Sequence, residues 1–210
     1  MPMSTPLRRR GPSKGDLKQE AILETAERLL AVKPLAEIGI GELAAGAGIS
    51  RSSFYFYFES KQALLSALLD KAADALLADV DTWLEPSTGE PGHEICQSVE
   101  VAVRMWREHG AVLLAAQNPD SPPEAREFTA GLTARLIEAS AAVIRHKREE
   151  GQAPDGPPSA EALATMLIGM TEHCIARHFT SPSLVRDDRE LIDTLTAVWT
   201  RSIFAADLPR

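Results

Sequence analysis

The segment IGELAAGAGISRSSFYFYF, residues 40–58, has the layout of a helix-turn-helix. Leu43 gives a short first helix an apolar face, and Ala47 is small enough for a close helix crossing. Gly48 can take the left-handed backbone conformation that a tight turn between two helices requires. Ser50 is well placed to cap the N-terminus of the second helix. The segment therefore predicts a compact helical unit that presents its second helix to DNA.

Aromatic side chains are crowded into the second helix of this segment. The chain holds six Phe, two Tyr and three Trp, and five of these eleven form one run, residues 54–58. Phe54 and Phe58 are four residues apart, so they share a helix face and are expected to point into the core. Tyr55 and Tyr57 point elsewhere, and each has a hydroxyl that can donate to a phosphate oxygen. An ordinary core segment is the alternative, but it leaves the glycine turn and the adjacent serines unexplained.

Two helix starts in this region predict contacts with DNA. Arg51, Ser52 and Ser53 occupy the first turn of the second helix, where recognition helices meet base edges in the major groove. Ser60 can cap the next helix, whose free amide groups attract anions, and Lys61 adds a positive charge there. We therefore expect the first group to contact bases, and Lys61 to bind phosphate together with the two tyrosines.

The net charge of -8 is unfavourable for DNA binding, but the charge is unevenly distributed along the chain. Residues 1–61 hold nine Lys and Arg against seven acidic residues, a net charge of +2, and the remainder carries -10. A basic head on an acidic body lets one end approach a polyanion; chance asymmetry is the alternative. The arm RRRGPSKG, residues 8–15, is predicted to be disordered. It either follows the minor groove of DNA or only adds solubility.

The composition predicts a soluble cytoplasmic protein that does not enter a membrane. No apolar run approaches the roughly 18 residues of a membrane span, and the basic start lacks the apolar segment of a secretory leader. The two cysteines, Cys96 and Cys174, have no paired spacing, which favours a reducing compartment over a disulfide framework.

Prolines and glycines divide the chain into blocks rich in helix-forming residues. Apolar residues recur in these blocks every three or four positions, and none alternates with the period of a strand. We therefore predict an all-α protein with an arm at 1–15, a DNA-binding head at 16–60 and a body at 61–210. About nine helices are expected, at 16–31, 41–47, 51–57, 60–84, 93–109, 111–117, 123–150, 159–180 and 187–205.

The body has no arrangement of residues typical of an enzyme. GIGELA, residues 39–44, matches a dinucleotide-binding fingerprint in its letters but lacks the strand that must precede it. His173 and His178 are five residues apart and diverge on a helix, so they do not form a metal-binding pair. Cys174 fits a small buried residue better than a nucleophile. We predict no catalytic residue, no metal site and no cofactor.

Scattered polar residues on the apolar stripes of the body are typical of a cavity for a small apolar molecule. Thr133 and Ser140 share one face of the helix expected at 123–150, and Thr171 lies among apolar residues on the helix expected at 159–180. For each of these residues alone, ordinary core packing is the alternative interpretation.

The segment AILETAERLLAVKPLAEIGIGELAAGAGISRSSFYFYFESKQALLSALLD, residues 21–70, resembles the DNA-binding head of the TetR family of bacterial repressors. FYFYFESK and the later pieces SAAVIRHKREEGQAP and DTLTAVWTRSI are similar to the ethionamide-resistance branch of that family. The resemblance implies binding to double-stranded operator DNA. Gly39 stands where many relatives have Thr or Ser, which leaves a backbone contact to phosphate at most. The implied groove-facing positions are Arg51, Ser52 and Ser53, and the implied phosphate-contacting positions are Tyr55, Tyr57 and Lys61.

The same resemblance implies that the body binds a ligand and forms a dimer. Bodies of that branch enclose an elongated, mostly apolar tunnel for a small effector, and the last two helices of each subunit form a four-helix bundle in a homodimer. Leu191, Leu195, Val198 and Ile203 are available for this bundle. The positions that match the tunnel lining are Ile95, Ala102, Trp106, Thr133, Leu136, Ser140, Ile168, Thr171 and Trp199.

The leading hypothesis is a homodimeric repressor whose operator affinity is controlled by a small apolar ligand in the body. A second hypothesis keeps DNA binding but gives the body a filled cavity. A helical lipid-binding or carrier protein is the alternative from another class. The stretch AGAGISRSSFYFYFESK disfavours it, because a carrier has no use for a DNA-binding head.

Overall fold

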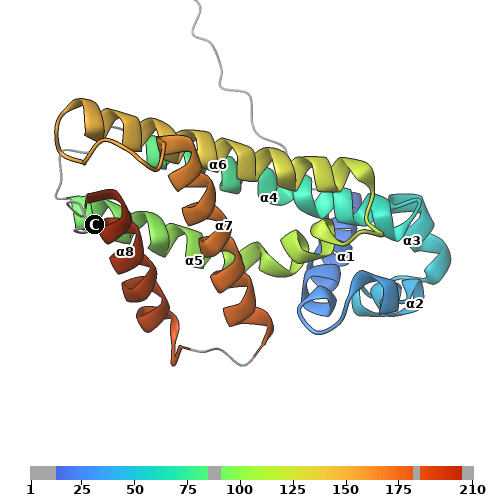
Figure 1. Cartoon of the computed structure of the whole chain (residues 1–210). Helices are drawn as coiled ribbons and strands as arrows, with labels where there is room; N and C mark the ends of the chain where they lie inside the picture. Colours follow the sequence, from blue (N-terminus) through green and yellow to red (C-terminus); the bar gives the residue numbers. More distant parts are fainter. Residues whose placement is uncertain (1–12, 85–90, 182–184, 205–210) are drawn as a thin grey trace, which may run out of the picture. The chain divides into compact units, whose positions relative to one another are not determined.

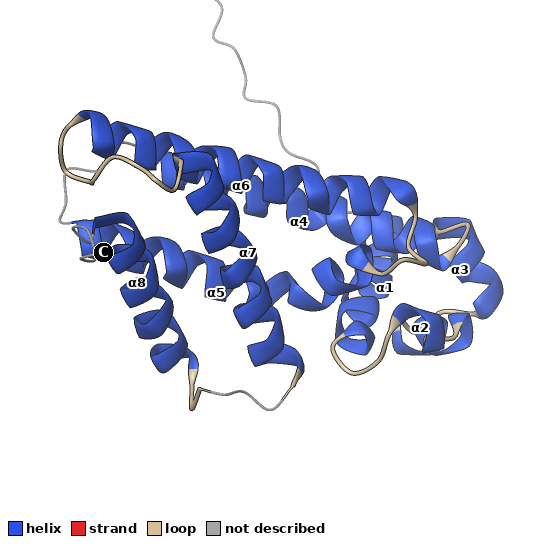
Figure 2. Cartoon of the chain, in the orientation of Figure 1, coloured by secondary structure: helices blue, strands red, loops and turns tan. Residues whose placement is uncertain are grey.

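The computed structural model describes residues 13–84, 91–181 and 185–204, and helices joined by loops make up these ranges (Figures 1 and 2). The all-α fold class is as predicted. Contacts divide the chain into two compact units, one ending at Leu68 and the other beginning at Leu69, both within one long helix. The elements are α1 (Lys14–Leu30), the short 3₁₀-helix η1 (Leu35–Glu37), α2 (Ile40–Gly46), α3 (Arg51–Tyr57), α4 (Lys61–Leu84), α5 (Pro91–Gln117), α6 (Pro123–Glu149), α7 (Ala160–Thr180) and α8 (Asp188–Phe204).

The first helix begins two residues earlier than the sequence predicts, because a capping box forms there. Asp16 N donates to Ser13 Oγ at 3.2 Å, and Ser13 N donates to Asp16 Oδ2 at 2.8 Å. This reciprocal pair satisfies two backbone donors at the helix start. Residues 13–15 therefore belong to the head and not to the predicted arm; residues 1–12 lie outside the described part of the chain.

The turn between α2 and α3 has the predicted geometry. Gly48 has a φ of 65°, the left-handed conformation that its position requires. Ser50 caps α3, since its Oγ accepts from Ser53 N at 3.1 Å. The close approach of α2 to α1 involves Gly46 and not the predicted Ala47: a Cβ on Gly46 would collide with Thr25.

The two phenylalanines of α3 and its C-cap hold the head together, as predicted. Phe54 is 0% exposed and Phe58 is 5% exposed, and their ring centroids are 5.9 Å apart. Ile22 of α1 and Leu43 of α2 are also fully buried. The burial of Phe54 and Phe58 therefore fixes the orientation of α3, including the side of the helix that faces solvent.

One helix, α5, replaces the two that the sequence predicts at 93–109 and 111–117. Gly110, at the expected break, is buried in the interior of α5, and the ring of Trp106 covers it one turn earlier. Glycine costs about 1 kcal/mol in a helix relative to alanine. The structure keeps the helix intact because this position needs a residue without a side chain beneath the indole.

Helix α5 is central to the second unit, where it contacts α6, α7 and α8 (Figure 1). Helix α6 packs along α7, and α7 and α8 also contact each other. Ile144, Leu167, Ile168, Trp199 and Ile203 belong to the apolar core between these helices. None of the described helices has the length and apolarity needed to cross a membrane.

Candidate functional site

The N-terminal end of α3 presents polar side chains to solvent above a buried base. Arg51 and Ser52 are exposed and Ser53 is half-buried, while Phe54 directly after them is fully buried. Ser50 Oγ lies 2.8 Å from the hydroxyl oxygens of both Ser52 and Ser53. The three serines thus form a local cluster of donors and acceptors that can be redirected to a ligand on the helix surface.

Helix α3 also exposes an aromatic residue that the sequence analysis did not assign. Phe56 is 84% exposed, more than Tyr55 at 48%, and it contacts Tyr57 edge-to-face with ring centroids 5.3 Å apart. The helical period was the available signal: Phe56 is four residues after Ser52, on the face opposite Phe54. The outward face of α3 therefore combines an apolar ring with the polar first turn.

Lys61 makes contacts that its position at a helix start did not suggest. Its Nζ donates to the backbone oxygens of Leu35, Ala36 and Ile38, at 2.8, 3.1 and 2.9 Å. An ammonium group has three donors, so this set uses all of them. Lys61 thus anchors the segment that leads into α2, and a phosphate contact would have to displace one of these carbonyls.

The N-terminus of α2 is capped by the side chain of Glu42, a residue of the same helix. Gly39 N donates to Glu42 Oε2 at 2.8 Å, and Lys33 Nζ donates to Glu42 Oε1 at 2.6 Å. The hydrogen bond from Lys33, followed by that from Gly39, lowers the pKa of the Glu42 carboxyl. The backbone amide considered at Gly39 for a phosphate contact is therefore already occupied by Glu42 in the free protein.

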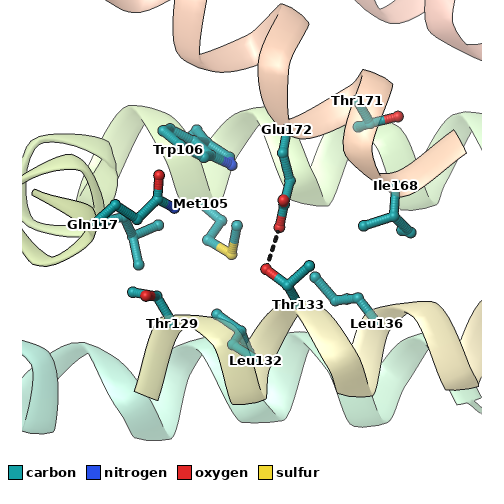
Figure 3. Close-up of a pocket in the computed structure, with 11 residues that line it drawn as sticks. Met105, Trp106, Gln117, Thr129, Leu132, Thr133, Leu136, Ile168, Thr171 and Glu172 are labelled. Carbon is teal, nitrogen blue, oxygen red and sulfur yellow. Dashed lines mark hydrogen bonds between the residues drawn. The ribbon is translucent and has the colours of Figure 1, made fainter. Parts of the chain in front are cut away.

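The second unit contains a cavity between α5, α6 and α7 (Figure 3). Figure 3 shows the carboxylate of Glu172 reaching from α7 toward Thr133 on α6, with Trp106 on one side and Ile168 on the other. The lining residues are Met105, Trp106, Leu113, Gln117, Thr129, Leu132, Thr133, Leu136, Ile168, Thr171 and Glu172.

Five of the nine residues predicted for the tunnel line this cavity together: Trp106, Thr133, Leu136, Ile168 and Thr171. The other four, Ile95, Ala102, Ser140 and Trp199, do not. Trp199 instead belongs to the adjoining apolar core, and Ile95 is partly buried and packs against that core.

The cavity is narrow in this structure. The space that it encloses is about 30 Å³, which is room for about two water molecules. Sites for drug-sized ligands are roughly ten times larger. A ligand must therefore move side chains; unbranched Met105 and exposed Gln117 can do so with little disturbance of the core.

Glu172 is a polar lining residue that the sequence analysis missed. Its Oε1 accepts a hydrogen bond from Thr133 Oγ1 at 2.7 Å. Burial raises the pKa of the Glu172 carboxyl, and the hydrogen bond from Thr133 offsets part of that effect. Its position next to Thr171, one turn after Ile168, was the available signal, but the sequence does not reveal which face of α7 the carboxylate occupies.

Two further polar groups belong to the wall and core beside the cavity. Trp199 Nε1 of α8 donates to Thr171 Oγ1 at 2.8 Å, so Trp199 is linked to the cavity without lining it. Ser140 is 6% exposed, and its buried hydroxyl has no hydrogen-bond partner among the described residues. The hydroxyl of Ser140 is thus a candidate for a ligand contact if the cavity extends along α6.

The residues proposed for the dimer bundle separate into two groups. Leu191, Leu195 and Ile203 are buried inside the protomer, so the expectation that they extend toward a partner is wrong for them. Val198 of α8 is 37% exposed. Met166 on α7, which the sequence analysis did not name, is 70% exposed, and a Cβ on Gly169 would meet none of the described residues within 4 Å.

The described ranges 13–84, 91–181 and 185–204 contain no group of His, Cys, Asp and Glu side chains that could hold a metal ion. His178 Nε2 lies 2.9 Å from Asp188 Oδ1 on α8, away from His173, which is exposed. Both cysteines are free thiols.

Two family models match this chain and together cover both units. The model for bacterial regulatory proteins of the tetR family matches residues 22–68. The model for the C-terminal domain of the transcriptional regulator EthR matches residues 95–205, more than half of the chain.

Individual proteins resemble the chain over nearly its whole length. The HTH-type transcriptional regulator EthR of Mycolicibacterium smegmatis is 37% identical over 198 residues, which cover 94% of this chain and 91% of the relative. EthR of Mycobacterium tuberculosis is 36% identical over 199 residues, 94% of this chain and 92% of the relative. The crystal structure of AibR with isovaleryl coenzyme A and operator DNA has the same fold, with a TM-score of 0.67 at 15% identity, covering 86% of this chain and 97% of AibR.

Proposed function

Because this chain belongs to the TetR family of DNA-binding transcriptional regulators, with a C-terminal domain of the EthR type, we propose that it is a homodimeric repressor in the cytoplasm whose α3 binds operator DNA and whose body cavity binds a small effector. Arg51, Ser52 and Ser53 contact base edges in this proposal, and Tyr55 and Tyr57 contact phosphates.

The observation that carries the DNA-binding assignment is the division of α3 into two faces. Phe54 and Phe58 are buried, while Arg51 and Ser52 are exposed at the N-terminal end and Phe56 is exposed in the middle. A rigidly seated helix with exposed donors at its N-terminal end suits insertion into a major groove. Lys61 then acts on DNA binding mainly by holding the segment before α2 in place.

The cavity supports the effector half of the proposal. It is mostly apolar, with a few polar groups, which is the usual composition of a small-molecule site. The AibR structure is a complex with both isovaleryl coenzyme A and operator DNA, which provides a precedent for two ligands on this fold. An effector controls DNA affinity only through its different affinities for the DNA-bound and free conformations.

Exposed apolar residues on the last two helices support dimerisation there. Met166 and Val198 are exposed on α7 and α8, and Gly169 leaves open space on α7 for the approach of another helix. Two heads related by two-fold symmetry would contact half-sites about one DNA turn apart.

DNA binding tests the proposal directly. Fragments of the DNA upstream of the protein's own coding region should retain the protein, and affinity should fall steeply with salt. Arg51→Ala should weaken binding to the specific site by roughly 1–3 kcal/mol and change the preference at one base position of each half-site. Arg126→Ala, which removes an exposed arginine from α6, is the matched control and should have no such effect. Equal losses for the two variants would refute the assignment of α3.

Dimerisation has a separate test by light scattering of the eluted protein. Met166→Asp should shift the protein toward the monomer, because a charge would be buried at the interface. Val143→Asp changes a residue that is 41% exposed on α6 and should leave the dimer intact. A stable dimer in the Met166→Asp variant would place the interface elsewhere.

A further inference from the structure

Among the described residues that line the cavity, one carries a formal charge. Six of these eleven residues are apolar, Gln117 and three threonines are neutral and polar, and Glu172 is ionisable. Burying a charged ligand group is costly unless a partner of opposite charge receives it. The cost of burying a charged ligand group therefore depends most on how close that group lies to Glu172.

The hydrogen bonds around Glu172 leave it able to accept from a ligand. Thr133 donates to Oε1, and an ionised carboxylate offers about four acceptor sites on its two oxygens. The hydroxyl of Thr171 already accepts from Trp199 Nε1. Among the described lining residues, Glu172 is thus the strongest acceptor that a ligand donor can reach.

Ligand classes differ in how they meet this acceptor. A carboxylate or phosphate ligand would place a like charge beside Glu172. A neutral hydroxyl or amide would form an ordinary hydrogen bond. A protonated amine would form a charge-assisted bond, which is roughly twice as strong.

We propose that the effector of this protein is an apolar molecule that carries one protonated amine, and that Glu172 is the residue that selects it. The inference rests on the proposed effector role of the cavity and goes further by assigning the chemical class of the ligand. The apolar part occupies the space between Leu132, Leu136 and Ile168, and the amine lies against Glu172 and Thr133. Because the cavity is narrow, small flexible probes are the appropriate test ligands.

Three probes with the same chain separate the effect of charge from that of size: octylamine, octanol and octanoate. Titration calorimetry and thermal unfolding of the full-length protein near neutral pH compare their affinities. Octylamine should bind at least about tenfold more tightly than octanol, and octanoate should bind most weakly. Equal affinities, or a preference for octanoate, would overturn the proposal while leaving the effector cavity in place.

Variants assign the preference to Glu172. Glu172→Gln keeps the shape of the side chain and an acceptor for Thr133, so octanol should bind as before and octylamine should lose its advantage. Glu127→Gln removes one exposed negative charge from α6 and should keep that advantage, which controls for net charge. An unchanged amine preference in Glu172→Gln would refute the assignment. If that variant does not fold, Glu172→Asp, which withdraws the carboxylate by one methylene, should show a reduced preference.

Failure of this inference is distinguishable from failure of the proposed function. If none of the three probes binds, the cavity is not an effector site, and both this inference and the effector half of the proposed function fall. Retention on operator DNA is measured without any probe, so the DNA-binding half stands or falls separately.

Discussion

Trp199 on α8 donates a buried hydrogen bond to Thr171 on α7, with 2.8 Å between Nε1 and Oγ1. Both side chains are nearly inaccessible, with exposures of 6% and 5%. Thr171 also lines the cavity, so one hydroxyl is shared between the cavity wall and the contact between the last two helices. A ligand that shifts Thr171 must also disturb the position of Trp199, which provides a physical connection between the cavity and α8.

Thr171→Val tests this connection. The variant keeps the shape of the side chain but leaves the Trp199 indole N–H without its acceptor, so we expect a loss of about 1–3 kcal/mol in the free energy of unfolding. Urea denaturation measures the loss, and Thr171→Ser, which keeps the hydroxyl, should retain most of the stability. In a Trp199→Phe background the cost of Thr171→Val should shrink; an unchanged cost would show that the hydrogen bond contributes nothing.

Glu172 predicts a pH dependence of stability. Burial raises its pKa in the folded protein, so the folded state binds the proton more tightly than the unfolded state does. The contribution of Glu172 to the free energy of unfolding therefore falls as the pH rises from the ordinary glutamate value through the raised value, and is constant above it. Glu172→Gln should accordingly be more stable than the unmodified protein at pH 8, with a smaller advantage near pH 4. Thermal unfolding across this range measures the difference, and a difference independent of pH would contradict the prediction.

Phe56 and Phe54 form a matched pair on one helix. Phe56→Ala removes a side chain that is 84% exposed, so stability should change by less than about 0.5 kcal/mol. Its affinity for operator DNA should fall about tenfold, because an exposed apolar ring on α3 can contact thymine methyl groups in the major groove. Phe54→Ala should instead cost about 3–5 kcal/mol of stability. Retention assays and thermal unfolding separate the two effects, and full operator affinity in Phe56→Ala would exclude a role in DNA binding.

Lys61→Met should destabilise the head. The thioether side chain keeps much of the length but removes the donors to Leu35, Ala36 and Ile38, and we expect a loss of about 1–3 kcal/mol. Hydrogen exchange should show faster exchange at the start of α2. If stability is unchanged and only the salt dependence of DNA binding falls, Lys61 acts as a phosphate contact instead.

Gly46 and Gly41 give opposite expectations within α2. A Cβ on Gly46 collides with Thr25, so Gly46→Ala should cost about 1–3 kcal/mol through a forced separation of α1 and α2. A Cβ on Gly41 meets none of the described residues within 4 Å, so Gly41→Ala should stabilise the helix by up to about 1 kcal/mol. Chemical denaturation compares the pair. Equal effects would show that α1 and α2 are not in close contact at Gly46.

Local signals in the sequence predicted much of the head. The turn depends on the positive φ of Gly48, and the start of α3 depends on the cap at Ser50. Both effects involve only residues close together in the sequence. The burial of Phe54 and Phe58 follows from their spacing on a single helix. Helical period and proline positions likewise gave most of the helices to within two residues, because each depends on neighbours along the chain.

Contacts between distant residues decided the rest. The ammonium of Lys61 donates to three carbonyl oxygens that lie more than twenty residues earlier in the chain. Gly110 is part of a continuous helix because the ring of Trp106 packs over it. Leu191, Leu195 and Ile203 were buried inside the protomer by neighbouring helices, although their stripe fits a dimer interface equally well. The carboxylate of Glu172 met Thr133 only because α6 packs along α7. A helical period specifies which residues share a face, but only the packed tertiary structure determines what that face contacts.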